Sequence, residues 1–530
     1  QTNVQVLGID EPDMIKTNGQ ELFVSGLQQA IYYDELIDKP RPMSNDVESD
    51  SDVDSDVESV ISISNPKFAL APDYMPYRKS QNLTQIIDVS DPKNLGILDE
   101  IKDYGDLLLN GDILVIFSGN NIFGYDVSDR NDPKRKWEIN LKDSQVMTSR
   151  LYNGKLYIVT NSYNYDLIPC PLSPFEINGK EMSIPCTDVY RPDVIVPYAV
   201  TYHALIIDPN SGDMKNSLSF VGSGQSSAIY MSQDNLYITY TFRASEVDLV
   251  AGFLKDNIDV FPNETRSKIL KLADLEISNQ AKQVELEQII NKYTGSLDKD
   301  ERVKFENDLR NLGQKYLDKH SRELESTGIV SINLDSFKIE NTGKVPGHLL
   351  NQFSLDEYKG NLRVATTIGE QWFGRFGQLS QSENDIYVLD ADLDVIGELQ
   401  GLGLTEQIYS ARFIGDTGYI VTFRQTDPFY VIDLSNPKNP EMKGELKIPG
   451  YSSYLHPLKD KLILGIGREN GQVKLSLFDV SDPSNPKEKD KYTLTEYYSD
   501  IESNYRAFLQ DADNEVFFIP GSQSAYIFIL

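Results

Sequence analysis

Short apolar runs alternate with turn residues along most of the chain, and they do so in one repeated order. An apolar run meets a turn that contains Gly or Asp-Asn, and a run rich in β-branched and aromatic residues follows, as in "LLLNGDILVIFS" (107–118) and "ARFIGDTGYIVTF" (411–423). Turn residues that tolerate positive φ are strong hairpin signals between two such runs.

A third apolar run ends in a phrase such as "VIDLSNPKNP" (431–440) or "LFDVSDPSNP" (477–486). There Asp and Ser can bond to their own backbone and Pro stops the strand. The pattern predicts units of four antiparallel strands, with this phrase as the turn between the third and the fourth.

The polar residue that ends each third strand is a marker for counting the units. The markers are Asp88, Asp126, Asp208, Asn333, Asp390, Asp433 and Asp479. Three steps between neighbouring markers match the roughly 40–50 residues of a four-stranded propeller blade, and each of the three longer steps contains a segment of different composition. We therefore predict an all-β fold, a single β-propeller over residues 1–530. Counting the second strands gives eight blades, and seven is the alternative.

The last predicted unit is incomplete, because the chain stops inside the apolar strand 524–530. One explanation is ring closure, in which residues 3–7 supply the missing outer strand of the last blade, since closed rings remove most sheet edges. The other is that a longer parent chain continues past Leu530. The sequence slightly favours closure.

Residues 35–80 form an acidic insertion. The three acids that could bind calcium in it are Asp50, Asp52 and Asp54. Carboxylates at this spacing can supply hard oxygen ligands, but an EF-hand loop would need Gly at position 55 and Glu at 61, where the chain has Ser55 and Ile61. A solvated loop is the alternative that the sequence favours.

Residues 161–198 form a Pro-rich insertion with no obvious helix or strand, and they hold the only two cysteines, Cys170 and Cys186. A disulfide between them would close a loop of roughly 15 residues, worth about 3 kcal/mol in the chain-entropy model. Two unrelated buried thiols are the alternative. The disulfide, which we favour, indicates an oxidising, extracellular or cell-surface setting.

Residues 243–327 are charged, contain few Gly and Pro, and place apolar residues at helical spacing. We predict an inserted α-helical hairpin between the second and third strands of a blade. One apolar stripe of this hairpin is Phe305, Leu309, Leu312 and Tyr316. The stripe either packs inside the insertion and on the blade edge or contacts a partner protein.

The formal net charge of −31 argues against nucleic acid or an anionic membrane surface as a partner. Proteins and divalent cations are compatible with it. No run of about 18 apolar residues occurs, so we predict no transmembrane segment. The chain starts at Gln1 without an apolar leader, as expected of the mature form of a secreted protein.

Motifs for common catalytic chemistry are missing from the sequence. The four histidines are not spaced as zinc ligands, and neither a nucleophile elbow nor a P-loop occurs. Carboxylates are too numerous for one pair to be singled out. The sequence names no active site.

Four long stretches, at 2–26, 345–369, 409–440 and 445–471, resemble the secreted β-propeller-domain family of archaea and bacteria, which is distantly related to WD repeats. The likeness covers most of the chain. It implies a propeller and export, and it implies no reaction and no catalytic residues. The acidic segment 45–60 departs from the family pattern.

Three acids precede the first predicted strand within the family-like opening. They are Asp10, Glu11 and Asp13. Ordinary turn chemistry explains them, and a calcium site near the ring closure is the alternative interpretation.

These observations favour an extracellular or cell-surface binding or assembly scaffold that acts on a protein partner or by self-assembly. The alternative is a secreted hydrolase or lyase that acts on polysaccharide or peptide with acids at the mouth of the central channel. An enzyme needs polar groups with perturbed pKa values that converge in one concavity. A scaffold needs exposed apolar patches on its rim or on the helical insertion.

Overall fold

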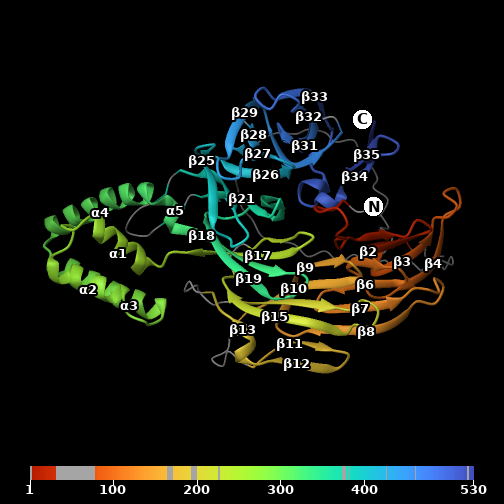
Figure 1. Ribbon diagram of the computed structural model, residues 1–530, viewed down its shortest axis with the longest axis horizontal. Coiled ribbons are helices and arrows are strands. Elements are labelled where there is room, and N and C mark those ends of the chain that lie inside the picture. Colours follow the sequence, from red (N-terminus) through yellow and green to blue (C-terminus); the bar gives the residue numbers. More distant parts are fainter. Residues whose placement is uncertain are drawn as a thin grey trace, which may run out of the picture.

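The computed structural model describes residues 3–31, 78–163, 171–192, 200–224, 227–369, 371–372, 378–379, 381–424, 427–459, 461–521 and 524–529. Eight small antiparallel sheets stand in a ring, and the colours of Figure 1 follow the chain around it. The predicted eight-bladed propeller is confirmed, and the seven-bladed alternative is wrong.

The blades follow one another along the chain, and within a blade each strand pairs with its neighbour in sequence. Blade 1 contains β1 (Ile15–Thr17), β2 (Glu21–Ile31), β3 (Arg78–Asp88) and β4 (Gly96–Ile101). Blade 2 contains β5 (Asp106–Asn110), β6 (Ile113–Ser118), β7 (Asn121–Asp126) and β8 (Lys134–Leu141). Blade 3 contains β9 (Ser144–Tyr152), β10 (Lys155–Tyr163), β14 (Val200–Ile207) and β15 (Met214–Gly222). Blade 4 contains β16 (Ile229–Met231), β17 (Asn235–Arg243), β18 (Glu325–Asn333) and β19 (Ile339–Pro346).

The second half of the ring repeats this order until its last blade. Blade 5 contains β20 (Leu355–Tyr358), β21 (Asn361–Ile368), β24 (Glu383–Leu389) and β25 (Val395–Leu402). Blade 6 contains β26 (Gln407–Ile414), β27 (Thr417–Phe423), β28 (Asp427–Asp433) and β29 (Glu441–Ile448). Blade 7 contains β30 (Tyr451–Pro457), β31 (Leu462–Glu469), β32 (Gln472–Asp479) and β33 (Lys487–Thr493). Blade 8 contains β34 (Leu509–Asp511), β35 (Val516–Pro520) and β36 (Ala525–Ile529), and no described residue forms a fourth strand in it.

The repeated phrase is the turn between third and fourth strands, as predicted. Its first side chain accepts the backbone N–H two residues later, at 2.9 Å for Asp88 and Ser90 and at 3.0 Å for Asp479 and Ser481. The serine hydroxyl donates to the same oxygen, and these two hydrogen bonds lower the pKa of both exposed aspartates. Local side-chain chemistry of this kind is readable from sequence because it needs no distant partner.

The turns of blades 6 and 7 also rest on the fourth strand of the preceding blade. A Cβ added to Gly444 in β29 would lie 2.3 Å from the carbonyl oxygen of Pro483, in the turn of blade 7. A Cβ on Gly397 in β25 would lie 2.1 Å from the carbonyl oxygen of Pro437, in the turn of blade 6. Glycine is therefore required at these two positions, where the next turn approaches the strand backbone. The phrase recurs because it joins blades as well as strands.

Buried apolar side chains fill seven of the eight junctions between neighbouring blades. One side chain from each cluster, in order from the junction of blades 1 and 2 to that of blades 7 and 8, is Leu114, Ile158, Ile238, Leu362, Ile420, Phe478 and Phe517. Among the residues that the structure describes, no such cluster joins blade 8 to blade 1.

The insertion at 161–198 contains strands that the sequence did not reveal. β11 (Leu172–Ile177) pairs with β8 and β12 (Lys180–Ile184) pairs with β11, so a loop of blade 3 widens the outer edge of blade 2. The expectation of no regular structure is wrong, because an outer edge offers hydrogen-bonding groups that even a Pro-rich segment can pair with.

The remainder of this insertion bears on the predicted disulfide. A 3₁₀ helix (Cys186–Asp188) leads into β13 (Val189–Tyr190), which runs parallel to β15. Cys170 lies outside the described residues, so its disulfide with Cys186 stays a prediction.

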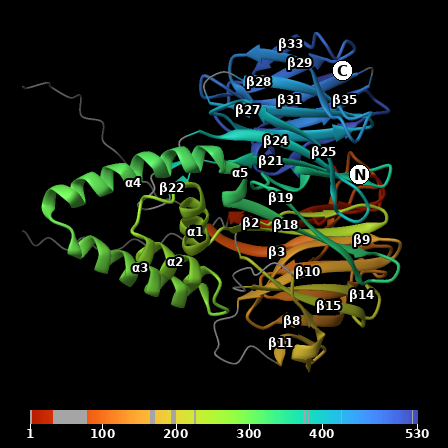
Figure 2. The same cartoon turned by 60° about the vertical axis from the view of Figure 1, so that its left-hand side comes forward.

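Five helices stand between β17 and β18, the second and third strands of blade 4, as predicted. They are α1 (Glu246–Asp256), α2 (Asn263–Ala273), α3 (Asn279–Ser296), α4 (Lys299–Lys319) and α5 (Ser321–Leu324). Ser278 caps α3, and Asp298 with Glu301 forms a capping box at α4. The group projects away from the ring (Figure 2) and is larger than the simple hairpin that we expected. Within the described residues, none of the helices is both long and apolar enough to cross a bilayer.

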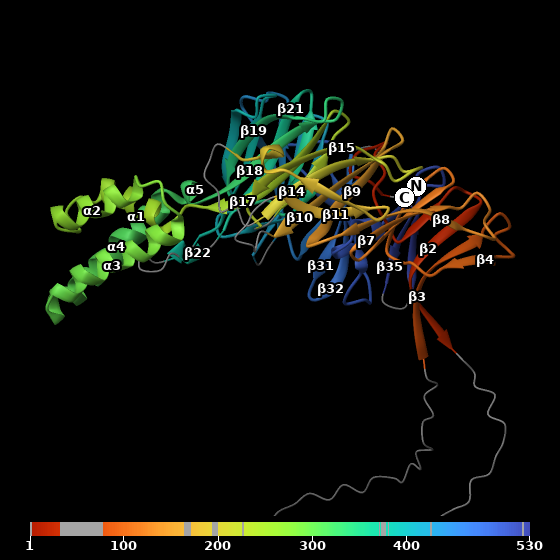
Figure 3. The same cartoon turned by 90° about the horizontal axis from the view of Figure 1, so that it is seen from below.

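Two further segments interrupt the ring. β2 and β3 extend past the other blades as a long hairpin (Figure 3), and the chain between them covers most of the predicted acidic insertion. Its candidate calcium ligands Asp50, Asp52 and Asp54 lie outside the described residues. In blade 5, β22 (Gln371–Trp372) and β23 (Gln378–Leu379) form a separate two-stranded sheet between β21 and β24.

Candidate functional site

The central channel is lined by the first strands of the blades, which lie side by side, as β1 does with β5 and β26 with β30. The described residues 3–7 form no strand and do not complete blade 8, so our closure prediction is wrong. They lie against the inner strands instead. Asn3 donates to the Tyr454 hydroxyl of blade 7 at 2.7 Å, and Gln5 donates to the Leu355 carbonyl of blade 5 at 3.1 Å.

The segment then crosses to the opposite side of the ring. Asp10 and Leu151 of blade 3 exchange backbone hydrogen bonds of 2.9 Å, and Asp13 and Leu107 of blade 2 exchange bonds of 3.1 and 2.7 Å. The N-terminal segment, defined here as residues 3–13, therefore occupies the channel and connects blades 2, 3, 5 and 7.

A buried carboxylate is the centre of these contacts. Glu11 is 2% exposed, and its two oxygens lie 3.7 Å from guanidinium nitrogens of Arg150 and Arg506. The Tyr505 hydroxyl donates to it, and the backbone N–H of Gln5 donates at 3.2 Å. Burial opposes ionisation, but the two arginines and the tyrosine hydroxyl prevail and hold the pKa of Glu11 below its usual range. The carboxylate is thus ionised, and both of its oxygens have partners.

The neighbouring acids have separate surroundings. The buried Lys16 places its Nζ 2.7 Å from Asp10 and donates at 2.6 Å to the Glu11 carbonyl oxygen. Asp13 accepts the N–H of Met14 at 2.7 Å, and burial raises its pKa. Among the described residues no three His, Cys, Asp or Glu side chains gather as a metal site would require. The structure therefore does not bring the three acids together as a ligand set, and their bonds are those of turns and ion pairs.

Sequence reasoning missed the cationic and phenolic partners of Glu11. Tyr505 is separated from Glu11 by 494 positions, and Arg150 and Arg506 carry no local motif. No signal in a single sequence pairs residues at such a distance.

A groove of about 980 Å³ opens where blade 8 faces blade 1. Its apolar lining comes from both sides and includes Ile15, Leu22, Leu509, Phe518 and Ile519. Asp10, Asp13 and Arg506 of the channel lie at one part of it. The junction that lacks a buried apolar cluster is therefore an open, apolar cleft.

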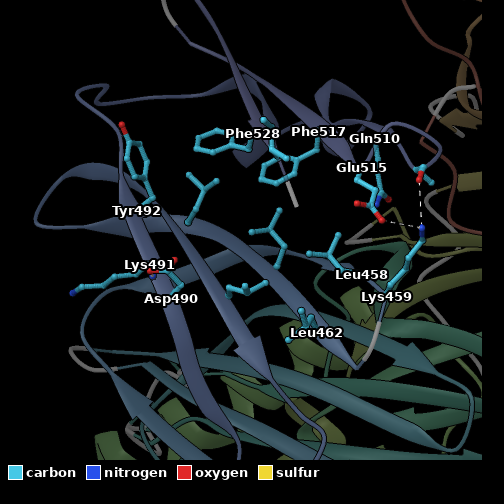
Figure 4. Close-up of a pocket in the computed structure, with 15 residues that line it drawn as sticks. Leu458, Lys459, Leu462, Asp490, Lys491, Tyr492, Gln510, Glu515, Phe517 and Phe528 are labelled. Carbon is cyan, nitrogen blue, oxygen red and sulfur yellow. Dashed lines mark hydrogen bonds and ion pairs between the residues drawn. The ribbon is translucent and has the colours of Figure 1, made fainter.

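A second groove, of about 410 Å³, lies between blade 7 and blade 8 (Figure 4). Leu462, Phe517 and Phe528 form part of its apolar lining, and Asp490 and Lys491 of β33 stand at one side. The incomplete eighth unit was the one sequence signal for either groove.

The predicted partner-binding stripe lies inside the helical insertion. Phe305, Leu309 and Tyr316 are buried, and Leu312 packs beside them. Phe305 makes an edge contact with Phe261 at 5.2 Å between ring centroids. The side chains of the stripe contact neighbouring helices instead of forming an outer surface.

Ion pairs fix the base of the insertion to the ring. Arg322 of α5 lies 2.7 Å from Glu383 and 2.8 Å from the fully buried Asp385, both on β24 of blade 5. Glu325, at the start of β18, lies 2.7 Å from His348. The helices are therefore held against blade 5 as well as by their own blade.

Comparison with protein families matches residues 1–527 to the beta propeller domain. A protein of Archaeoglobus fulgidus is 42% identical over 528 residues, which cover 100% of this chain and 76% of that protein. A protein of Methanocaldococcus jannaschii is 40% identical over 533 residues, which cover 99% of this chain and 74% of that protein. Both relatives are described as uncharacterised proteins.

Solved structures give a much weaker likeness. Pyrococcus horikoshii acylaminoacyl peptidase (orthorhombic crystal form) aligns with a TM-score of 0.31 and 11% identity, over 83% of this chain and 53% of that chain. At this TM-score the likeness carries no functional information.

Proposed function

This chain belongs to the beta propeller domain family, and from that membership we propose that it is a binding scaffold for another polypeptide outside the cell or at the cell surface. Propellers commonly act through their rims and loops, where grooves and insertions present contact surfaces. The observation that carries the proposal is the open apolar groove between blades 8 and 1. Each of the other seven junctions contains a buried apolar cluster, and only the smaller groove between blades 7 and 8 accompanies one of them among the grooves described here.

The channel supports the same proposal by what it contains. A hydrolase or lyase acting there would need an acid free to exchange protons with a substrate. Glu11 is instead paired with two arginines and a tyrosine, and Asp10 is paired with Lys16. The pairing of Glu11 and Asp10 with basic side chains favours a scaffold over the enzyme alternative.

The extracellular setting rests on the sequence. Cys170 and Cys186 are close enough along the chain for a stabilising disulfide, and the resemblance is to a secreted family. Intact mass after alkylation, with and without prior reduction, tests the pairing, and modification of both thiols without a reductant would contradict it. Calcium binding by the acids at 45–60 remains a prediction tested by calorimetry with Ca²⁺.

Selection of a displayed random-peptide library on the immobilised protein tests the scaffold proposal. We expect selected peptides to slow amide exchange at residues 14–17 and 509–529, the two walls of the groove. A Glu383→Gln variant, altered at the base of the helical insertion, serves as a control and should bind as the original does. Failure to enrich any peptide, protection confined to residues 3–11, or cleavage of the bound peptides would overturn the proposal.

A further inference from the structure

His320 lies where three helices of the insertion meet. It stands between the last residue of α4 and the first residue of α5, and its backbone N–H donates to the Tyr316 carbonyl at 3.0 Å. Its Nδ1 lies 2.8 Å from a carboxylate oxygen of Glu323 in α5, and its Nε2 lies 3.2 Å from one of Asp256, the last residue of α1. One imidazole ring therefore joins the ends of α1 and α4 to α5.

The two carboxylates determine which protonation state fits this ring. An ionised carboxylate only accepts hydrogen bonds, whereas a neutral imidazole has one N–H donor and one acceptor nitrogen. A neutral His320 would therefore turn a lone pair toward one of the two carboxylates, and only the imidazolium donates to both. Hydrogen bonds between ionised groups are also stronger than those between neutral groups. The geometry favours the protonated ring.

The groups that face His320 in the described part of the chain support the same state. Burial lowers the pKa of His320, but its hydrogen bonds to Glu323 and Asp256 prevail and raise the pKa above the ordinary 6.5. Lys319 opposes the imidazolium, but the Lys319 Nζ is itself paired with Asp256 at 2.8 Å. The ring stacks on Tyr316 at 4.3 Å between centroids, and an aromatic face attracts a cation. Groups from all three helices thus act on one titrating ring.

Apolar packing joins α1 to α4 beside this ring. Tyr316 lies across Gly252 of α1, where an added Cβ would stand 2.3 Å from the tyrosine hydroxyl oxygen. Phe253 makes an edge contact with the Tyr316 ring at 5.7 Å between centroids. These apolar contacts do not depend on pH, whereas the bond from His320 to Asp256 at the end of α1 does. Loss of the charge should therefore open the end of α1 and leave the helices folded.

We propose that His320 is a proton-dependent latch, which holds the end of α1 against α5 when the ring is protonated and releases it when the ring is neutral. The pKa of His320 lies above the ordinary 6.5, so the latch is complete below pH 6.5 and is lost as the pH rises through the raised value. Arg322 keeps α5 on Glu383 and Asp385 of blade 5 throughout, because a guanidinium stays charged. The released segment is the end of α1 and its connection to α2, residues 254–262.

Titration of the His320 ring tests the charge state. The complete chain contains 4 histidines, so carbon-13 labelling of histidine gives few NMR signals, and the signal that disappears in His320→Gln is that of His320. We expect its titration midpoint to lie above 6.5 and to fall in both Asp256→Asn and Glu323→Gln. Glu264→Gln is the matched control, because Glu264 forms an exposed ion pair with Lys268 elsewhere in the insertion. A midpoint at or below 6.5, or one that neither variant lowers, would overturn the proposal.

Hydrogen exchange at pH 6 and pH 9 tests whether the charge holds α1 in place. The rates are expressed as protection factors, which are corrected for the intrinsic pH dependence of amide exchange. We expect residues 254–262 to lose at least about threefold in protection at the higher pH, since one unit of pKa shift corresponds to about tenfold. Blades 6 and 7 should keep their protection.

His320→Gln separates the latch from an ordinary surface ion pair. Glutamine does not titrate, so this variant should show the lower protection of residues 254–262 at both pH values, with thermal unfolding confirming that it is folded. Protection in the original chain that does not change with pH, or that changes equally in His320→Gln, would contradict the latch even if the midpoint of His320 is raised.

Discussion

The junction between blades 6 and 7 and the junction between blades 8 and 1 join the same kind of module in different ways. The first is filled by Phe429, Phe478 and their neighbours, with the two rings stacked at 4.3 Å between centroids. The second is an apolar groove beside the channel, where Glu11 binds Arg506 of the segment preceding blade 8. Packing holds one junction, and buried ion pairs next to the channel hold the other. A repeat can therefore close into a ring without repeating its interface.

The largest expected effect is at the ion-paired junction. Glu11→Ala leaves Arg150 and Arg506 without their carboxylate, and breaking a buried ion pair on one side typically costs about 3–5 kcal/mol. We expect urea unfolding to show a loss of this size. Hydrogen exchange should quicken at residues 15–24 and 509–529, and it should stay unchanged in blades 6 and 7. Equal acceleration in all blades would mean that Glu11 does not act at this junction.

The packed junction responds to a different change. Gly444→Ala places a Cβ 2.3 Å from the Pro483 carbonyl oxygen, and forced overpacking of this kind costs typically about 1–3 kcal/mol. Asp490→Ala is the matched control in the fourth strand of blade 7, just after its register shift, and we expect it to change stability by less than about 0.5 kcal/mol. Equal losses in urea unfolding would show that the close approach of the turn is not the cause.

Acid acts at two other places in the ring, the interior of blade 3 and the contact between blades 7 and 8, because each contains a buried histidine. Burial lowers the pKa of His203 to about 4 and is the main cause that lowers the pKa of His456 to about 4. Both values lie below the ordinary 6.5, so the unfolded chain takes up protons first as the pH falls. The stability is present above pH 6.5 and is lost as the pH falls toward 4, by about 2 kcal/mol per histidine between pH 7 and pH 5.

Unfolding measured against pH in the original and in two single variants checks this expectation. His203 lies within blade 3 between Ser162 and Ser219, whereas His456 contacts Gln510 of blade 8 at 2.9 Å. His203→Gln and His456→Gln should each flatten the pH dependence by about half. The protection factors of residues 509–511, which are corrected for the intrinsic pH dependence of amide exchange, should become independent of pH in His456→Gln. An unchanged slope in both variants would assign the acid sensitivity to carboxylates.

The smallest effect is expected on the exposed side of β36. Ile527→Lys changes an exposed side chain on β36, so stability should change by less than about 0.5 kcal/mol. Ile519→Lys on β35 buries a charge at a fully buried position and should cost several times more. A loss above about 2 kcal/mol for Ile527→Lys would show that this side chain is covered.

The sequence predicted features that depend on neighbours along the chain. The turns at Asp88 and Asp479 follow from side chains two residues away, and the helical insertion follows from its apolar period. The prediction of a strand at residues 3–7 was wrong, because these residues bind Leu355 and Tyr454, which lie hundreds of positions away along the chain. The stripe at Phe305 was recognised, but an amphipathic pattern does not say whether its apolar face meets another helix of the chain or another protein.

The fourth strands of blades 5 and 6 are covered by the turn of the blade that follows, so assembly of the ring is directional along the chain. Gly397 and Gly444 are covered by backbone that is translated later, so a nascent ring always ends in one unfinished blade. Synthesis would protect every blade in succession and leave the newest one exposed until its successor emerges from the ribosome. A ribosome stalled inside the array should therefore display a single accessible sheet edge, wherever the stall occurs.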